Sequence, residues 1–169
     1  VVCLCPSTEA NLGDGLFPLR VWLDRGGRMA IGSDSQITIN PFEELRWLEY
    51  GQRLHTRSRN VAALNGSHTG KNLFSQALEG GQRACGHDAG GLRVGGPADL
   101  VTLDDGSPML AGHDTRSTFD ALVFSGGRSP LDRVMVAGEW RVIDGEHVNY
   151  PQLKTDYLAV IRDLWAETG

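Results

Sequence analysis

The chain has 169 residues, and its 16 lysines and arginines against 21 aspartates and glutamates give a formal net charge of −5 with the histidines neutral. Its composition, 40% hydrophobic and 22% charged, is typical of a soluble globular protein of one or two domains and excludes a mainly disordered chain. No run approaches the roughly 18 to 20 apolar residues of a membrane helix, so we expect no membrane partner. The scattered basic residues argue against nucleic acid as a partner.

The three cysteines, Cys3, Cys5 and Cys85, are odd in number, which favours a reducing compartment. Because the chain also starts without a secretory leader pattern, we expect a cytoplasmic protein. Cys3 and Cys5 lie two apart, so an extended strand would turn both to one face. Such a pair could bind a soft metal, but no second pair accompanies it, and two small buried side chains are the favoured interpretation.

The first residues of the chain predict a strand, loop, helix and strand. Residues 1–5 form a continuously apolar run of the kind that is covered on both faces of a parallel sheet. The polar, glycine-containing segment Ser7–Gly15 predicts an irregular loop. A short helix over 16–23 and a second buried strand over 28–34 complete a βαβ unit, whose strands should be parallel neighbours.

Two longer helices are expected next. Asn40 is a capping residue followed by proline at the first helical position, and apolar residues recur at helical spacing to about Leu54. A second helix is predicted over 73–78, ended by Gly80 and Gly81 with a further turn after them.

The composition changes near Gly86, at the start of the glycine-rich segment 86–96, and the chain beyond it predicts mainly strands. Four apolar segments bounded by turn residues are strand candidates: 98–103, 121–124, 134–136 and 140–143. Residues 137–139 are typical of a tight hairpin. The tail over 151–166 has the pattern of an amphipathic helix.

The carboxyl ends of parallel strands are where this arrangement gathers reactive groups. Asp34 stands at the polar carboxyl end of the second predicted strand, where a carboxylate can bind a divalent metal or take a proton from water. Asp34 is therefore the strongest candidate for both roles. The alternative is that its side chain simply caps the turn after the strand.

Other patterns of catalytic residues are lacking in the sequence. Ser33 and Ser35 flank Asp34 without a G-x-S-x-G motif, and no glycine pair is followed by the helix start of a phosphate-binding loop. We therefore expect no nucleotide site. The five histidines form no H-x-H or H-E-x-x-H motif, so each is expected on the surface or in a loop: His55, His68, His87, His113 and His147.

Several segments together resemble a known enzyme family. Cys5–Gly15, Ile31–Ser35 and Glu43–Leu54 closely resemble the C-terminal part of formimidoylglutamate deiminases, which belong to the amidohydrolase superfamily. Gly91–Val101 is similar to the glycine-rich lead into an Ala-Asp-Leu-Val strand that recurs across that superfamily.

The resemblance implies an α/β fold that is the C-terminal portion of a (β/α)8 barrel. Residues 1–5 would be strand seven, and strand eight would end at Asp34. The implied division is barrel over 1–86, strands of a small β-sandwich over 87–150 and a C-terminal helix over 151–169. In the family, the Asp that closes strand eight binds zinc and relays a proton, so Asp34 is the implied metal ligand and catalytic residue.

The implied function is zinc-dependent hydrolysis of N-formimino-L-glutamate to N-formyl-L-glutamate and ammonia, a step of histidine degradation, by an enzyme that is expected to be a homodimer. The family's other metal ligands and substrate-binding residues have no counterpart here. We therefore expect a fragment that binds zinc weakly and does not catalyse by itself. Glu9 and Asn11 should face the same barrel mouth, without an assigned role.

Two alternatives stay open from the sequence. One is another aminohydrolase of the superfamily, similar to guanine deaminase, which would share the barrel and the strand-eight Asp. The other is a noncatalytic binding module formed by the β-rich half from about Gly86.

Overall fold

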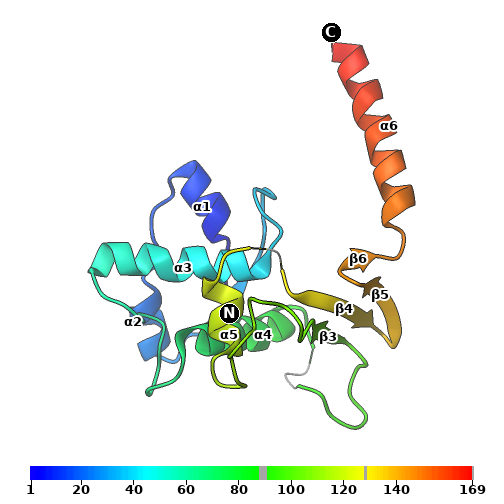
Figure 1. Ribbon diagram of the computed structural model, residues 1–169. Helices are drawn as coiled ribbons and strands as arrows, with labels where there is room; N and C mark the ends of the chain where they lie inside the picture. The colour runs from blue at the N-terminus through cyan, green and yellow to red at the C-terminus, as the bar shows by residue number, and fades with distance from the viewer. Residues whose placement is uncertain (88–90, 128, 169) are drawn as a thin grey trace. The chain divides into compact units, whose positions relative to one another are not determined.

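The computed structural model describes residues 1–87, 91–127 and 129–168 (Figure 1). The chain forms two compact units, one of residues 1–91 with 106–129 and the other of residues 92–105 with 130–169. Residues 88–90 of the predicted glycine-rich segment 86–96 lie outside the described residues. Within the described part of the chain, no helix combines the length and the apolar character needed to cross a bilayer.

The first unit is built on two parallel strands with helices around them. Its elements in chain order are β1 (Val2–Leu4), α1 (Pro6–Leu12), α2 (Leu19–Asp24), β2 (Met29–Ile31), α3 (Pro41–Thr56), α4 (Thr69–Ala84) and α5 (Thr118–Phe124). β1 pairs with β2 in parallel, with Val2 opposite Met29 and Leu4 opposite Ile31. The predicted βαβ unit and its parallel strands are therefore confirmed.

The predicted loop over Ser7–Gly15 is wrong, because α1 occupies most of it. Pro6 stands in the first turn, where its missing N–H costs no hydrogen bond. The Glu9 carboxylate accepts a hydrogen bond from the Cys5 backbone N–H at 2.8 Å. Gly13 ends the helix in the left-handed region, with φ of +75°, which glycine adopts without steric cost.

The long helix α3 begins as the sequence predicts. The Asn40 side chain accepts hydrogen bonds from the backbone N–H groups of Phe42 and Glu43 at 3.0 and 3.4 Å. This capping satisfies donors that a helix start otherwise leaves free. Leu45 and Leu48 are buried on the inner face, as their helical spacing predicts.

The helix predicted over 73–78 is longer than expected, and Gly80 and Gly81 do not end it. α4 continues through both glycines to Ala84 and packs on β2. A Cβ at Gly80 would lie 1.8 Å from the Met29 carbonyl oxygen. Gly80 is therefore the place where the helix backbone meets the strand, rather than a helix stop.

The strand predicted over 121–124 is also wrong, since these residues end the helix α5. Ala121, Leu122 and Val123 are all buried. A short apolar run that is buried on every side has the same pattern in a strand and in a helix. The Arg46 side chain of α3 donates to the Val123 and Ser125 carbonyls at 2.6 and 2.9 Å, which satisfies the free end of α5.

The second unit is a four-stranded antiparallel sheet followed by a helix. Its elements are β3 (Leu100–Leu103), β4 (Leu131–Val136), β5 (Glu139–Ile143), β6 (Glu146–His147) and α6 (Tyr150–Thr168), with the strands in the order β3-β4-β5-β6. The three predicted strands in this unit and the hairpin at Ala137 and Gly138 are confirmed, whereas β6 was not expected. The predicted C-terminal helix is also present, with exposed apolar side chains such as Leu153.

Candidate active site

Asp34 lies in the turn that follows β2, at the carboxyl end of the parallel pair. The turn is closed by a hydrogen bond from the Gln36 N–H to the Ser33 carbonyl at 2.9 Å. Asp34 has φ of +41°, a conformation that only a minority of residues other than glycine adopt. Its side chain is exposed and makes no hydrogen bond or ion pair with the described residues. The carboxylate is therefore not engaged in capping its own turn and is available to solvent.

The thiols of Cys3 and Cys5 lie beside this turn. A Cβ built on Gly32 would be 3.3 Å from Cys5 Sγ and 3.4 Å from Cys3 Sγ, so the two cysteines share one face of β1 as predicted. Burial raises the pKa of the Cys5 thiol to about 11, with smaller contributions from Cys3, Asp34 and Glu9. A thiol with that pKa is almost wholly protonated at neutral pH.

The prediction that both cysteines are buried is wrong. Cys3 is exposed and Cys5 is half-buried, so only one face of β1 is covered within this chain. Leu4, which points the other way, is buried at 3% exposure. The apolar run of β1 is thus covered on the side of the helices and open on the side of the thiols.

Two residues of α1 link the end of β1 to other parts of the first unit, and neither link was expected from the sequence: Ser7 contacts α3, and Thr8 contacts the turn after β2. The Ser7 N–H and hydroxyl both donate to the carboxylate of Glu44 on α3, at 2.9 and 2.5 Å. The Thr8 hydroxyl lies 3.0 Å from the Ser35 hydroxyl and 3.3 Å from the Ser33 carbonyl oxygen. Both contacts join residues more than 20 positions apart, so no local pattern reveals them.

The sequence did carry one signal for Glu44. It stands four residues before Leu48, on the face of α3 that the apolar spacing assigns to the core. The structure buries it at 2% exposure. An ionisable side chain at a core position requires a partner, and Ser7 is that partner.

Glu9 and Asn11, which were expected near the same site, both lie on α1. The Glu9 carboxylate is occupied by the Cys5 N–H, so it fixes the start of the helix. Asn11 is exposed near the other end of α1.

The histidines lie as predicted on or near the surface. Four of them are exposed, and the fifth, His147, is half-buried in β6. Among the described residues, no three His, Cys, Asp or Glu side chains gather closely enough to hold a metal ion. The described residues therefore do not by themselves provide the roughly four ligands of a zinc site.

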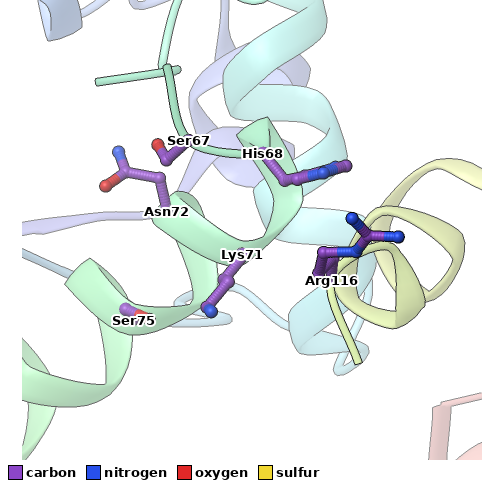
Figure 2. Close-up of a pocket in the computed structure, with 6 residues that line it drawn as sticks. All are labelled: Ser67, His68, Lys71, Asn72, Ser75 and Arg116. Carbon is purple, nitrogen blue, oxygen red and sulfur yellow. The ribbon is translucent and has the colours of Figure 1, made fainter. Parts of the chain in front are cut away.

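A shallow open hollow of about 240 Å³ lies elsewhere in the first unit, at the start of α4 (Figure 2). The residues that line it are polar or basic: Ser67, His68, Lys71, Asn72, Ser75 and Arg116. Neither strand end contributes to it. The hollow therefore shares no residue with the turn that carries Asp34.

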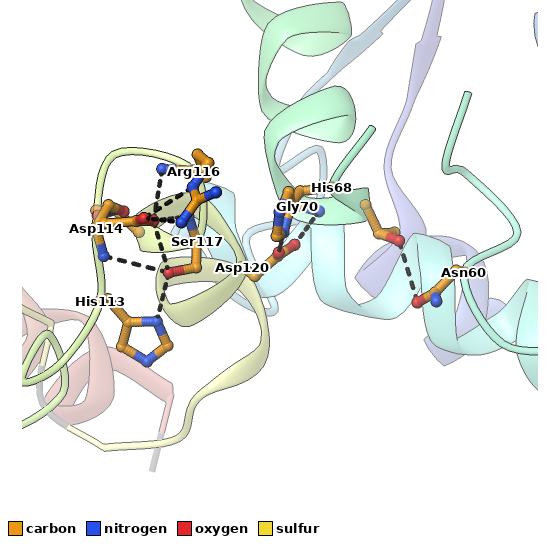
Figure 3. Close-up of polar contacts among 10 residues, drawn as sticks. Asn60, His68, Gly70, His113, Asp114, Arg116, Ser117 and Asp120 are labelled. Carbon is orange, nitrogen blue, oxygen red and sulfur yellow. Dashed lines mark hydrogen bonds and ion pairs between the residues drawn. The ribbon is translucent and has the colours of Figure 1, made fainter. Parts of the chain in front are cut away.

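Two of the residues that line this hollow, His68 and Arg116, pair with neighbouring aspartates. The Asp120 carboxylate accepts hydrogen bonds from the Gly70 N–H at 2.6 Å and lies 2.5 Å from His68 Nδ1 (Figure 3). Arg116 pairs with Asp114 at 2.7 Å, and this hydrogen bonding holds the pKa of the Asp114 carboxyl below its usual value. The Asp120 contacts join the start of α4 to α5, and the Arg116–Asp114 pair lies within the loop before α5.

The chain matches the model of the amidohydrolase family over residues 1–141 and belongs to that family. It is 44% identical over 165 residues to a formimidoylglutamate deiminase of Pseudomonas aeruginosa. The matched region covers 97% of this chain and 36% of the deiminase. The chain thus spans about a third of the length of this relative.

Two solved structures have a similar fold. One is the crystal structure of an amidohydrolase from Brucella melitensis, with a TM-score of 0.89 and 40% identity. The match covers 96% of this chain and 36% of the Brucella chain. The other is an adenosine deaminase from Xanthomonas campestris with bound zinc, with a TM-score of 0.76 and 22% identity. The match covers 99% of this chain and 37% of the deaminase chain. The second likeness concerns the fold alone.

Proposed function

We propose that this chain is the C-terminal part of a formimidoylglutamate deiminase. The whole enzyme would hydrolyse N-formimino-L-glutamate to N-formyl-L-glutamate and ammonia in the cytoplasm, as a step of histidine degradation. The observation that carries the proposal is the 44% identity to the Pseudomonas aeruginosa enzyme over 97% of the chain. The structure supports the proposal through the exposed carboxylate of Asp34, which lies just beyond the end of β2.

In this proposal the two parallel strands are strands seven and eight of a (β/α)8 barrel. The second unit would belong to the small β-sandwich beside the barrel. The open thiol face of β1 is consistent with such a position, because the inner face of a barrel strand is covered by the other strands.

Asp34 would move the protons of the reaction. Water adds to the formimino carbon, and the Asp34 carboxylate accepts the proton that the water loses and gives it to the imino nitrogen, which becomes an amino group. The new hydroxyl then loses its own proton, through the same carboxylate, to that amino group; the C–N bond breaks, ammonia leaves, and the carbon keeps the oxygen as a formyl group. A carboxylate held at the end of a strand is suited to both transfers.

Zinc belongs to the proposal for the whole enzyme only. Asp34 would supply one ligand, and the remaining ligands would come from residues outside this chain. The chain alone is expected to bind zinc weakly and to lack activity. The whole enzyme is proposed to be a homodimer.

The test uses the longer protein that carries this segment. Ammonia release is measured with N-formimino-L-glutamate and, separately, with guanine, for the unsubstituted protein and for Asp34→Asn. Turnover of the linear formimino substrate and a loss of about 10²- to 10⁴-fold in kcat/KM for Asp34→Asn would support the proposal.

Asp144→Asn is the matched control. Asp144 is also exposed, follows a strand and has a positive φ of +54°, but it lies in the second unit. It should leave turnover unchanged. Turnover of guanine in place of the formimino compound would overturn the substrate, and full activity of Asp34→Asn would overturn the assigned residue.

A further inference from the structure

The turn that carries Asp34 is held from outside its own segment. The Thr8 hydroxyl lies against both neighbours of Asp34, namely the carbonyl oxygen of Ser33 at 3.3 Å and the hydroxyl of Ser35 at 3.0 Å. The Ser35 N–H also donates to Thr8 Oγ1 at 3.3 Å. One arrangement satisfies all three contacts, in which Thr8 donates to Ser33 and accepts from both groups of Ser35.

Thr8 is itself fixed. It is buried at 3% exposure on α1, and its neighbour Ser7 is held through two hydrogen bonds by the buried Glu44 of α3. The position of the Thr8 hydroxyl is therefore set by the packing of α1 on α3. The turn that it contacts is on the surface, with Asp34 in an unfavourable backbone conformation that its surroundings must maintain.

We propose that Thr8 is a positioning residue for Asp34. By binding the backbone and side chain on both sides of Asp34, it fixes the direction in which the carboxylate leaves the end of β2. Glu44 of α3 supports Thr8 in this role by holding its neighbour Ser7 on α1. This inference rests on the proposed function of Asp34 and adds the residues that orient it.

The test compares three variants in the longer protein that carries this segment. Thr8→Val removes the hydroxyl and nearly keeps the shape, whereas Thr8→Ser keeps the hydroxyl. Thr69→Val is the control, because Thr69 is also a buried threonine of the first unit, and its hydroxyl donates to Asn60 Oδ1 at 3.2 Å. Amide hydrogen exchange of the segment 33–37 and the kinetic constants for ammonia release are measured for each.

Thr8→Val should speed amide exchange at Ser35 and lower kcat about 10- to 100-fold with KM little changed, because a displaced reactive group slows the reaction without removing a substrate contact. Thr8→Ser should restore both quantities. Thr69→Val should change neither of them. Equal losses of kcat in Thr8→Val and Thr69→Val, or no rescue by Thr8→Ser, would overturn the positioning role.

Two further variants separate a failure of the function proposed for Asp34 from a failure of the positioning role of Thr8. If Asp34→Asn is fully active while Thr8→Val still speeds exchange at Ser35, the function assigned to Asp34 fails and the contact itself stands. If Asp34→Asn is inactive and Thr8→Val changes neither exchange nor kcat, the positioning role fails. Should Thr8→Val not fold, Ser35→Ala removes one contact from the exposed side, and an unchanged kcat would then overturn the inference.

Discussion

Glu44 accepts two hydrogen bonds from Ser7, one from the backbone N–H at 2.9 Å and one from the hydroxyl at 2.5 Å. The two residues are 37 positions apart, and both are almost completely buried. This contact ties the beginning of α1 to the inner face of α3.

Glu44→Ala should therefore destabilise the first unit by about 3 kcal/mol, because it removes two hydrogen bonds and leaves the buried Ser7 N–H without a partner. Glu44→Gln keeps one acceptor oxygen and should cost about 1 to 2 kcal/mol. Urea unfolding followed by circular dichroism measures both values. Glu79→Gln, at an exposed glutamate of α4, should stay within about 0.5 kcal/mol, and an equal effect at the two glutamates would contradict the prediction.

A pair of adjacent glycines in α4 provides a second prediction. A Cβ at Gly80 would lie 1.8 Å from the Met29 carbonyl oxygen of β2, whereas a Cβ at Gly81 would have no heavy atom within 4 Å. Gly80→Ala should destabilise the first unit by about 3 kcal/mol or more, since helix and strand must separate. Gly81→Ala should instead stabilise it by about 0.5 to 1 kcal/mol through helix propensity.

Thermal unfolding of the two alanine variants tests this contrast directly. The two substitutions are chemically identical and one residue apart. Opposite signs of the change in stability can therefore only come from the position of β2. A stabilising Gly80→Ala would show that α4 does not lie against the Met29 carbonyl.

These two glycines also show what the sequence could and could not predict. Local signals were sufficient where a helix starts: the Asn40 cap and the spacing of Leu45 and Leu48 located α3 within a few residues. A glycine pair near the end of an apolar pattern is equally compatible with a helix end and with a helix backbone that packs closely on a neighbouring strand. Only the position of Met29, which is 51 residues away in the chain, distinguishes the two.

The candidate site has the same limit. The strand that precedes Asp34 could be predicted from its apolar run, and its parallel pairing with β1 confirms that strand. The role of Asp34 stays a prediction. The contacts of Thr8 and Glu44 could not be predicted, because their partners come from distant segments: Thr8 meets the turn after β2, and Glu44 meets Ser7 only when α1 packs on α3. In α5, the buried residues 121–123 have no polar face, so their pattern did not distinguish helix from strand.

A third prediction concerns the start of α4. Asp120 binds the Gly70 N–H and His68 Nδ1, so it occupies the positive end of the helix dipole. Asp120→Ala should cost about 1 to 2 kcal/mol of unfolding free energy. His68→Ala removes a partner that is 47% exposed and should cost less than about 1 kcal/mol. Urea unfolding measures both, and a larger loss for His68→Ala would show that the contact with Gly70 is of minor importance.

The last prediction follows from the raised pKa of Cys5. Burial, together with Cys3 and Asp34, raises the pKa of this thiol from 9.0 to about 11. Only the thiolate attacks an alkylating reagent, so at pH 8 the two-unit rise leaves about a hundredfold less reactive species than in an unperturbed cysteine. A more basic thiolate is also a better nucleophile, which recovers about tenfold and leaves a net rate about tenfold lower.

Iodoacetamide labelling of this chain, followed by mass spectrometry of its peptides, measures the rate at each cysteine. Cys5 should react more slowly than the exposed Cys3 and Cys85 at pH 8, and its rate should keep rising with pH until about 11, where the thiol is half ionised. Asp34→Asn removes one of the charges that oppose ionisation, so it should speed labelling of Cys5. A Cys5 rate that stops rising well below pH 11, or one unaffected by Asp34→Asn, would show that the thiol and the carboxylate do not share this end of the two strands.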